Sequence, residues 1–234
     1  MTAVMPEGIR SSFRVGAERA ICSLATGAHR EFLALSSETF RAYGAHLGWD
    51  VVISTESLSD RPPSWSKIVL MQELLEEYRT VWWIDADAVI VDLTRDVPID
   101  HEHPLWMAFH QHPGAQPVAN AGVVVAHRHD LTREFFDVVW RSERYIDHNW
   151  WENAAAVDLM GQSLEPPFAL IEHTVWRDRI GELPLDWNSV PRYCESPTPA
   201  IVHHARADHD SWSRRLGAIR ADVRRTLAKT QGAG

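Results

Sequence analysis

Two aspartates stand directly after one of the most apolar short runs of the sequence. In the segment WWIDADAVIVD, Asp85 and Asp87 follow the run 81–84. Carboxylates at positions i and i+2 of an extended chain point to the same side. Two hard oxygen donors placed in this way suit Mn²⁺ or Mg²⁺ held jointly with the phosphates of a substrate. The spacing therefore predicts a metal and phosphate site, while a role limited to capping and solvating a strand end stays open.

The element that must position these aspartates is a buried strand of a sheet. Short apolar runs alternate with longer segments of 3.6-residue periodicity, which is typical of an α/β fold with a mostly parallel sheet. We expect strands at 20–24, 50–54, 81–84, 105–109, 123–126 and 200–203. We expect helices at 31–47, 131–144, 150–160 and 210–229. A further helix is expected to begin after Ser64, its N-cap, and to extend to residue 78. Open sheets of this kind bind ligands at the carboxyl ends of their strands, where both aspartates would lie.

Composition narrows the class of protein. The sequence has 234 residues, of which 45% are hydrophobic and 24% charged, as in ordinary globular proteins. We expect one domain over residues 19–230, with a leader at 1–18 and a tail at 231–234. The formal charge of −9 disfavours binding to nucleic acid or to an anionic membrane. Two cysteines are too few for a disulfide framework. We expect no transmembrane segment and no signal peptide, and therefore a cytoplasmic protein.

Histidine pairs and a run of arginines each allow two interpretations. His101 with His103, and His110 with His112, could bind a transition metal, but the prolines beside them favour loops with solvated histidines. The arginines of the last helix are expected to form a solvated face, with anion binding as the alternative. They are Arg214, Arg215, Arg220, Arg224 and Arg225. The sequence contains neither GxxxxGKS/T nor GxGxxG, which argues against a glycine-rich phosphate loop.

The run WSKIVLMQELLEEYRTVWWIDADAVIVD resembles the donor-binding core of GT-A glycosyltransferases. It is most similar to the retaining family of fungal mannosyl- and galactosyltransferases and plant xyloglucan xylosyltransferases. The further segments SLATG, NAGVVV, WWENAA, DWNSVP and IVHHA follow in the order of that family. The resemblance spans residues 20–210 and implies a GT-A, Rossmann-like single domain with a mostly parallel central sheet flanked by helices.

The resemblance also implies roles for individual residues. Asp85, Asp87 and His203 would hold the metal, and Asp85 would also contact the donor. Glu152, Asn153 and Asp87 would act at the reacting sugar. The remaining donor-binding positions would be Lys67, Ala25, Thr26, Asn120, Gly122 and Asn188. A solvent-facing helix lysine is the alternative for Lys67, a simple strand entry for Gly122, and a favourable partner of the helix dipole for Glu152. His204 and Arg206 stand where the family has an aromatic residue and a glycine, which leaves the choice between His203 and His204 open.

The function implied is a metal-dependent glycosyltransferase, of hexosyl or pentosyl type, that uses a nucleotide-diphosphate sugar. UDP is the first candidate carrier and GDP the second, with Mn²⁺ or Mg²⁺ as the cofactor. An acceptor glycan, small molecule or peptide would supply the hydroxyl, and the anomeric configuration would be retained. If it were inverted, Glu152 would be the first candidate for the base. Two alternatives stay open: a phosphohydrolase of the DxDxT/V type with Asp85 as nucleophile, and a non-catalytic sugar-binding module with a structural metal.

Overall fold

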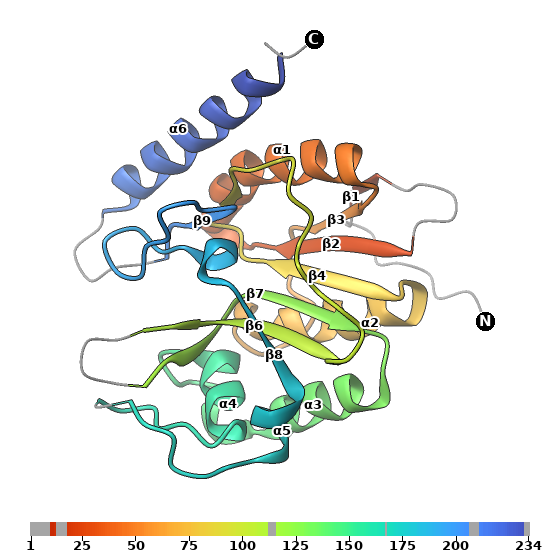
Figure 1. The fold of residues 1–234 in the computed structure, drawn as a ribbon, viewed down its shortest axis with the longest axis vertical. Helices are drawn as coiled ribbons and strands as arrows, with labels where there is room; N and C mark the ends of the chain where they lie inside the picture. The colour runs from red at the N-terminus through yellow and green to blue at the C-terminus, as the bar shows by residue number, and fades with distance from the viewer. Residues whose placement is uncertain (1–9, 13–17, 112–115, 167, 206–210, 232–234) are drawn as a thin grey trace.

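A seven-stranded sheet forms the centre of the protein (Figure 1), in a computed structural model that describes residues 10–12, 18–111, 116–166, 168–205 and 211–231. The strand order is β1-β3-β2-β4-β7-β6-β8. Their bounds are β1 Arg10–Ser12, β2 Arg19–Leu24, β3 Asp50–Ser54, β4 Thr80–Ile84, β6 Leu105–His110, β7 Val118–His127 and β8 Ile180–Leu183. All strands but β1 and β7 run in one direction, because only pairings with these two are antiparallel. The prediction of a mostly parallel sheet is confirmed.

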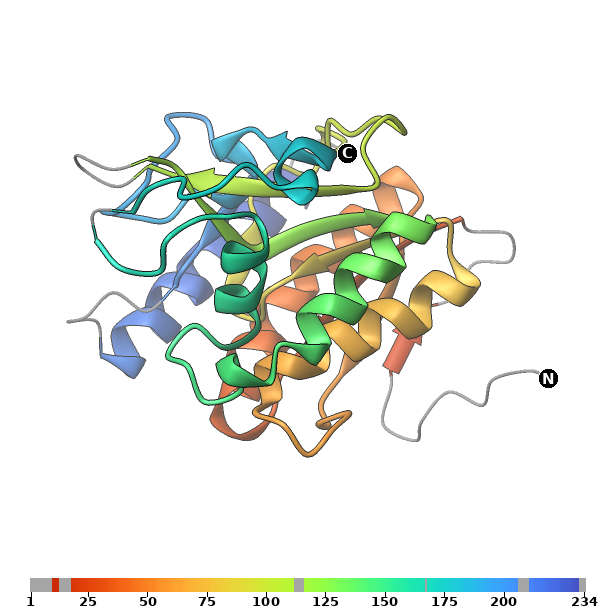
Figure 2. The ribbon, with the colours of Figure 1, turned by 90° about the horizontal axis from the view of Figure 1, so that it is seen from below.

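Helices cover both faces of this sheet. One face packs against α2 (Ser66–Glu77), α3 (Asp130–Arg141) and α4 (Trp151–Leu159), which lie across the sheet in Figure 2. The other face packs against α1 (Arg30–Leu47). The last helix, α6 (Trp212–Gln231), lies beside α1, and the short α5 (Val175–Arg179) precedes β8. Each face therefore has an apolar core of its own, which explains why β3 and β4 are buried along their whole length and β2 everywhere but at its first residue.

A small second sheet brings two distant segments together. Strand β5 (Ala88–Ile90) follows the aspartates and pairs antiparallel with β9 (Ile201–His203). In this register Ala88 lies opposite His203, so the residue after Asp87 is fixed beside the end of β9. Four 3-10 turns complete the described elements: η1 Gly27–His29, η2 Pro63–Trp65, η3 Glu143–Tyr145 and η4 Leu185–Asn188.

Several predicted elements are found close to their expected bounds, and others differ for local reasons. Helix α1 ends as expected before Gly48, whose φ of 78° is left-handed and suits glycine. Ser64 lies inside η2, and its hydroxyl makes no hydrogen bond within the described residues, so the prediction that it caps α2 was wrong. Strands β5 and β8 and helix α5 were not predicted, because each is short. No helix of the described chain is long and apolar enough to cross a membrane.

Part of the segment expected to be a leader belongs to the sheet. Residues Arg10–Ser12 form β1 and pair antiparallel with β3, while residues 1–9 and 13–17 lie outside the described part of the chain. The expected tail at 231–234 lies outside it as well, except for Gln231, the last residue of α6.

Candidate functional site

Asp85, Asp87 and His203 gather at the carboxyl end of β4. The Nε2 atom of His203 lies 3.3 Å from Oδ1 of Asp87 and 3.8 Å from Oδ2 of Asp85. One ligand atom from each residue lies within 4.8 Å of the others, as a single bound cation would require. The two aspartates are not on an extended chain, as the sequence interpretation assumed. They occupy a turn in which the Ala88 amide donates to the Asp85 carbonyl at 3.0 Å.

Backbone hydrogen bonds fix this turn from both sides. The Asp85 amide donates to the carbonyl of Gly122 on β7 at 2.8 Å, and the His204 amide donates to the Asp87 carbonyl at 2.9 Å. The turn is thus bound to the central sheet on one side and to the end of β9 on the other. Its position follows from pairing in both sheets and does not depend on the side chains that would bind a ligand.

The imidazole of His203 is held in one orientation by a chain of amides. Its Nδ1 lies 2.8 Å from Oδ1 of Asn188, and Nδ2 of Asn188 donates to Oδ1 of Asn120 at 2.9 Å. Because an amide oxygen can only accept, Nδ1 is the atom that carries the proton. In the neutral imidazole Nε2 is then free of a proton and faces the two carboxylates. Asn188 is fully buried, so we expect it to act by orienting His203 and not by direct donor contact.

Gly122 makes room for this imidazole. A Cβ atom added at Gly122 would lie 2.7 Å from Nδ1 of His203 and closer still to its Cε1. It would also lie 2.8 Å from Oδ1 of Asn120, which already accepts the Gly122 amide hydrogen at 2.9 Å. A side chain at this position would therefore displace His203, so glycine is required for a reason other than a strand entry.

A buried ion pair lies next to the aspartates. Nζ of Lys67 lies 2.8 Å from Oε1 of Glu152 and 3.3 Å from Oδ1 of Asp85, and it donates to the Ala121 carbonyl at 2.7 Å. Lys67 is 5% exposed, so the alternative of a solvent-facing helix lysine is wrong. Glu152 is 4% exposed and lies in the first turn of α4, where its alternative role as a partner of the helix dipole stays compatible with its ion pair to Lys67. The second carboxylate oxygen of Glu152 is buried without a hydrogen-bond partner among the described residues. It remains as an acceptor that a ligand hydroxyl could satisfy.

The ion pairs shift the pKa values of the site. Burial by itself would raise the pKa of Asp87, but the neighbouring His203 and Arg215 hold it at about 2. Burial disfavours the charged form of His203, but Asp87 and Asp85 outweigh this and raise its pKa. Burial also raises the pKa of the Glu152 carboxyl, and Lys67 opposes this rise. The site thus favours an ionised Asp87 and, as long as no cation replaces the proton, a protonated His203.

The structure separates the two adjacent histidines. His203 faces the aspartates, whereas Nε2 of His204 lies 2.8 Å from Oδ2 of Asp222 on α6. The geometry therefore places His203 in the metal cluster, the choice that the resemblance implied, and gives His204 a contact that fastens α6. Arg206 lies outside the described residues.

Arg215 of α6 belongs to the site, and the sequence interpretation missed it. Its Nη2 forms an ion pair with Oδ2 of Asp87, and its Nε donates to the His204 carbonyl at 2.9 Å. The prediction that all five arginines of this helix are solvated is therefore wrong for Arg215, which is 8% exposed. The spacing of the sequence could have identified it. Arg215 follows Trp212 by three residues and precedes Ile219 by four, which places it on the apolar stripe of the helix.

The other predicted site residues lie around this cluster. Ala25 and Thr26 follow β2 at the edge where Asp85 follows the neighbouring parallel strand β4; Ala25 is buried and Thr26 half-buried. Oδ1 of Asn153 accepts the Ala121 amide hydrogen at 2.8 Å, so Asn153 supports the strand that carries Gly122.

The histidine pairs do not form a second metal cluster in the described chain. Among the described residues, only Asp85, Asp87 and His203 bring three possible ligand atoms within 4.8 Å of one another. His110 was expected in a solvated loop, but it ends β6, is buried and lies 2.9 Å from the Asn188 carbonyl through Nε2. His101 packs against His127, with ring centroids 4.6 Å apart. His112 lies outside the described residues.

A divalent cation fits the residues that meet here. Two carboxylates and an imidazole with a free Nε2 are a donor set that accepts Mn²⁺, and Mg²⁺ less readily because it prefers oxygen ligands. The glycine at 122 leaves space for the imidazole, and the amide chain fixes the nitrogen that would bind. The side-chain exposures of Asp85 and Asp87, 30% and 15%, leave both accessible to a ligand.

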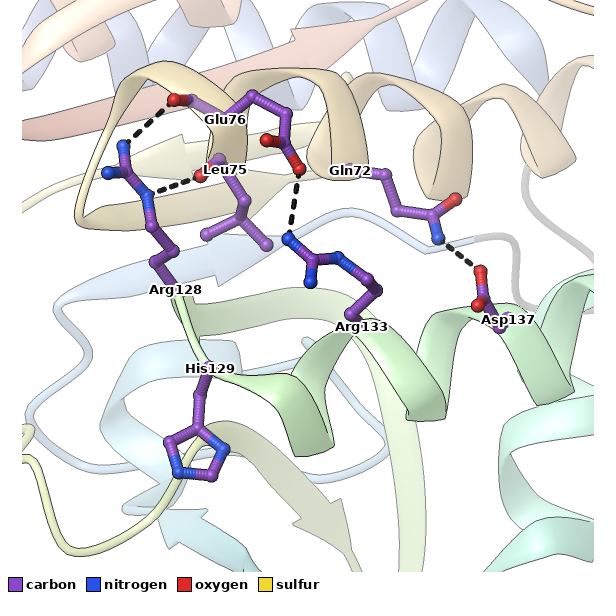
Figure 3. A pocket seen from close by; sticks show the side chains of 7 residues that line it. All are labelled: Gln72, Leu75, Glu76, Arg128, His129, Arg133 and Asp137. Carbon is purple, nitrogen blue, oxygen red and sulfur yellow. Dashed lines mark hydrogen bonds and ion pairs between the residues drawn. The ribbon is translucent and has the colours of Figure 1, made fainter.

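A surface pocket between α2 and α3, shown in Figure 3, lies at the other end of β4. It is lined by Gln72, Leu75, Glu76, Arg128, His129, Arg133 and Asp137. Its polar groups are largely paired with one another: Nε of Arg128 donates to the Leu75 carbonyl at 2.6 Å, and Nη2 of Arg133 lies 3.2 Å from Oε1 of Glu76. We interpret it as the junction that fastens the end of α2 to the start of α3.

No protein-family model matches the sequence, and no curated protein does. Solved structures do match the fold. A glycosyltransferase involved in the glycosylation of the major capsid of PBCV-1 aligns with a TM-score of 0.61 at 15% identity, over 86% of this chain and 98% of that one. The glycosyltransferase GlyE of Streptococcus pneumoniae TIGR4 aligns with a TM-score of 0.53 at 13% identity, over 91% of this chain and 64% of that one. An active-site mutant of LgtC aligns with a TM-score of 0.50 at 14% identity, over 86% of this chain and 95% of that one. The chain therefore has the fold of GT-A glycosyltransferases, as the resemblance implied.

Proposed function

We propose that this protein is a metal-dependent glycosyltransferase that moves a sugar from a nucleotide-diphosphate sugar to an acceptor hydroxyl. The observation that carries the proposal is the Asp85–Asp87–His203 cluster at the carboxyl edge of a sheet with the GT-A fold. Fold alone does not define function, so the proposal depends on this site. The cluster combines a cation-binding donor set with the edge of the sheet at which α/β folds bind nucleotides.

Asp85, Asp87 and His203 would hold the cation. When bound, the ion supplies positive charge beside the leaving diphosphate. Asn188 and Asn120 keep Nε2 of His203 directed at the cluster, and the Gly122 backbone fixes Asp85. These residues need no rearrangement to present their ligand atoms, which is the kind of preorganisation that electrostatic catalysis requires.

Glu152 would contact the donor sugar. One of its oxygens is held by Lys67, and the other is buried without a partner among the described residues. A carboxylate with one fixed and one unpaired oxygen can accept a hydrogen bond from a sugar hydroxyl and stabilise positive charge that develops at the anomeric carbon. Lys67 would keep this carboxylate ionised and oriented. Asn153 would act from the next position by supporting Ala121 on β7.

UDP as the carrier, retention of configuration, and an acceptor that is a glycan, small molecule or peptide rest on the sequence resemblance. The phosphohydrolase alternative would use Asp85 as a nucleophile. It is not favoured, because Oδ1 of Asp85 already accepts the Trp83 indole hydrogen at 2.6 Å and lies beside Lys67. The fold matches glycosyltransferases, which also makes a phosphohydrolase or a purely structural metal site the weaker choice.

A donor-hydrolysis screen tests the proposal. The full chain is incubated with UDP-sugars and GDP-sugars in Mn²⁺, and release of the nucleoside diphosphate is measured. We expect release from one donor, its loss in EDTA, and its return with Mn²⁺. Asp87→Ala should lower the rate at least ~100-fold. The control is Asp130→Ala, which removes a fully exposed carboxylate and should leave the rate unchanged.

Two results would contradict the proposed function. One is a wild-type protein that neither hydrolyses nor binds any of these nucleotides in Mn²⁺. The other is full turnover by Asp87→Ala.

A further inference from the structure

We propose that Arg215 is the internal counter-ion of the metal site and makes the site bind a divalent cation together with a diphosphate in preference to the cation alone. The inference rests on the proposed function and adds a residue of α6 to the same site. Arg215 is a positioning residue in this proposal, because its contact is with Asp87.

The guanidinium of Arg215 is fixed by three contacts. It pairs with Oδ2 of Asp87, donates through Nε to the His204 carbonyl at 2.9 Å, and lies over the Phe32 ring with its central carbon 4.8 Å from the ring centroid. With the side chain 8% exposed, these contacts leave the charge little freedom to move into solvent. Arg215 therefore acts on the site as a fixed positive charge.

The same ion pair orients the carboxylate of Asp87. Because Arg215 engages Oδ2, the other oxygen, Oδ1, is the one that faces Nε2 of His203 at 3.3 Å. A cation at the cluster would use this Oδ1 atom. Arg215 thus contacts a different oxygen of Asp87 from the one that faces His203, so that its charge opposes a bound cation without occupying that ligand atom.

Counting charges shows the effect of Arg215. Lys67 and Glu152 form a buried pair that is neutral whichever group holds the proton. Asp85 and Asp87 are negative and Arg215 is positive, so the site has a single net negative charge when His203 is in its neutral, cation-binding form. A divalent cation alone would reverse that charge in a largely buried site. A divalent cation with a nucleotide-diphosphate sugar adds no net charge, since each phosphate of the donor is singly negative.

Two further contacts hold α6 in place. Asp222 pairs with His204 at 2.8 Å, and Ile219 and Val223 pack against Phe32 and Val89. Neutralising Arg215 therefore removes a charge from the metal site and leaves other interactions to keep the helix docked.

The test compares Arg215→Gln with the wild-type full chain and with Arg220→Gln, which makes the same charge change at an exposed position of α6. Mn²⁺ affinity is measured without nucleotide by electron paramagnetic resonance. UDP and GDP affinities are measured by calorimetry in saturating Mn²⁺. Arg215→Lys, which keeps the charge, is the conservative variant.

We expect Arg215→Gln to bind Mn²⁺ alone about tenfold more tightly, because a unit charge ~5 Å from a divalent ion has at least that effect even in the dielectric of water. The same variant should bind the nucleoside diphosphate about tenfold more weakly. Arg220→Gln should match the wild type, and Arg215→Lys should lie much closer to it than Arg215→Gln does.

These opposite signs separate the proposal from structural damage, since a loosened site would lose affinity for both ligands. Weaker or unchanged Mn²⁺ binding by Arg215→Gln overturns the inference, as does unchanged nucleotide binding. If the wild-type chain binds neither nucleotide in Mn²⁺, the proposed function fails, and with it the nucleotide part of this inference. The Mn²⁺ measurement still decides whether Arg215 opposes the bare cation.

Discussion

The buried ammonium of Lys67 is expected to be worth several kcal/mol of stability. Lys67→Met keeps most of the apolar stem and removes the charge that contacts the Ala121 carbonyl, Glu152 and Asp85 at 2.7, 2.8 and 3.3 Å. Breaking a buried pair by deleting one partner costs about 3–5 kcal/mol, because the other charge stays buried without compensation. For a chain of this size such a loss lowers the unfolding temperature by about 6–20 °C.

The loss of stability should depend on pH with a defined sign. Burial already raises the pKa of Glu152, and Lys67 is the group that opposes the rise. Without Lys67, the pKa of the Glu152 carboxyl in the folded protein should rise further above its pKa in the unfolded chain. A carboxyl shifted in this direction destabilises the fold at high pH, and the penalty disappears as the pH falls below its unfolded pKa. The difference between Lys67→Met and wild type should therefore be large at pH ~8 and shrink towards pH ~5.

Urea unfolding of four proteins measures this effect. They are the wild type, Lys67→Met, Glu152→Gln and the double variant. Glu152→Gln in the Lys67→Met background removes the unpaired charge and should recover most of the lost free energy of unfolding. Lys229→Met is the matched control, since Lys229 is the only other lysine of the sequence and is exposed. A loss below ~1 kcal/mol in Lys67→Met at pH ~8, or no recovery in the double variant, would refute the reasoning.

Three further predictions concern the metal cluster. Gly122→Ala should weaken Mn²⁺ binding about 10–100-fold by displacing the His203 imidazole, as measured by titration of the purified protein; unchanged affinity would show that the ring can move without cost. His203→Ala should raise the Mn²⁺ requirement of turnover steeply, whereas His204→Ala, whose partner is Asp222, should be milder; a reversed order in metal titrations would contradict the placement of the two rings. Because the pKa of His203 is raised, Mn²⁺ affinity should fall as the pH drops through a value above the ordinary 6.5, and His203→Ala should lose this pH dependence.

The sequence predicted the part of the site that depends on local pattern. An apolar run followed by Asp85 and Asp87 gave the end of β4. The pattern predicts this strand end because a buried parallel strand is apolar along its length and its successive side chains point to opposite faces of the sheet. The resemblance implied His203 as the ligand, but the choice between His203 and His204 stayed open until the structure placed the two rings. The order of the other strands, including the antiparallel β7 at the centre of the sheet, depends on long-range pairing and could not be predicted.

The local sequence pattern could not predict which residues pair with the buried charges. Nothing near Lys67 in the sequence identifies Glu152 as its partner, since 85 residues separate them. Arg215 was assigned to solvent because arginines are usually exposed, although its spacing placed it on the buried stripe of α6. Asn188 was predicted to bind the donor, which stays a prediction; its contact with His203 is shown only by the three-dimensional structure.

The small sheet of β5 and β9 has a consequence for the order in which the protein folds. Asp87 and Arg215 are 128 residues apart, and His203 is brought to the aspartates by the pairing of β9 with β5. Contacts across such long loops form only after the entropy of closure has been overcome, so they are expected late in folding. During synthesis, β2 and β4 can pair while both carboxylates still lack their imidazole and guanidinium neighbours. The appearance of a tight cation site would therefore report that the last strand has docked, and a chain stopped before β9 would retain the aspartates without being able to complete that site.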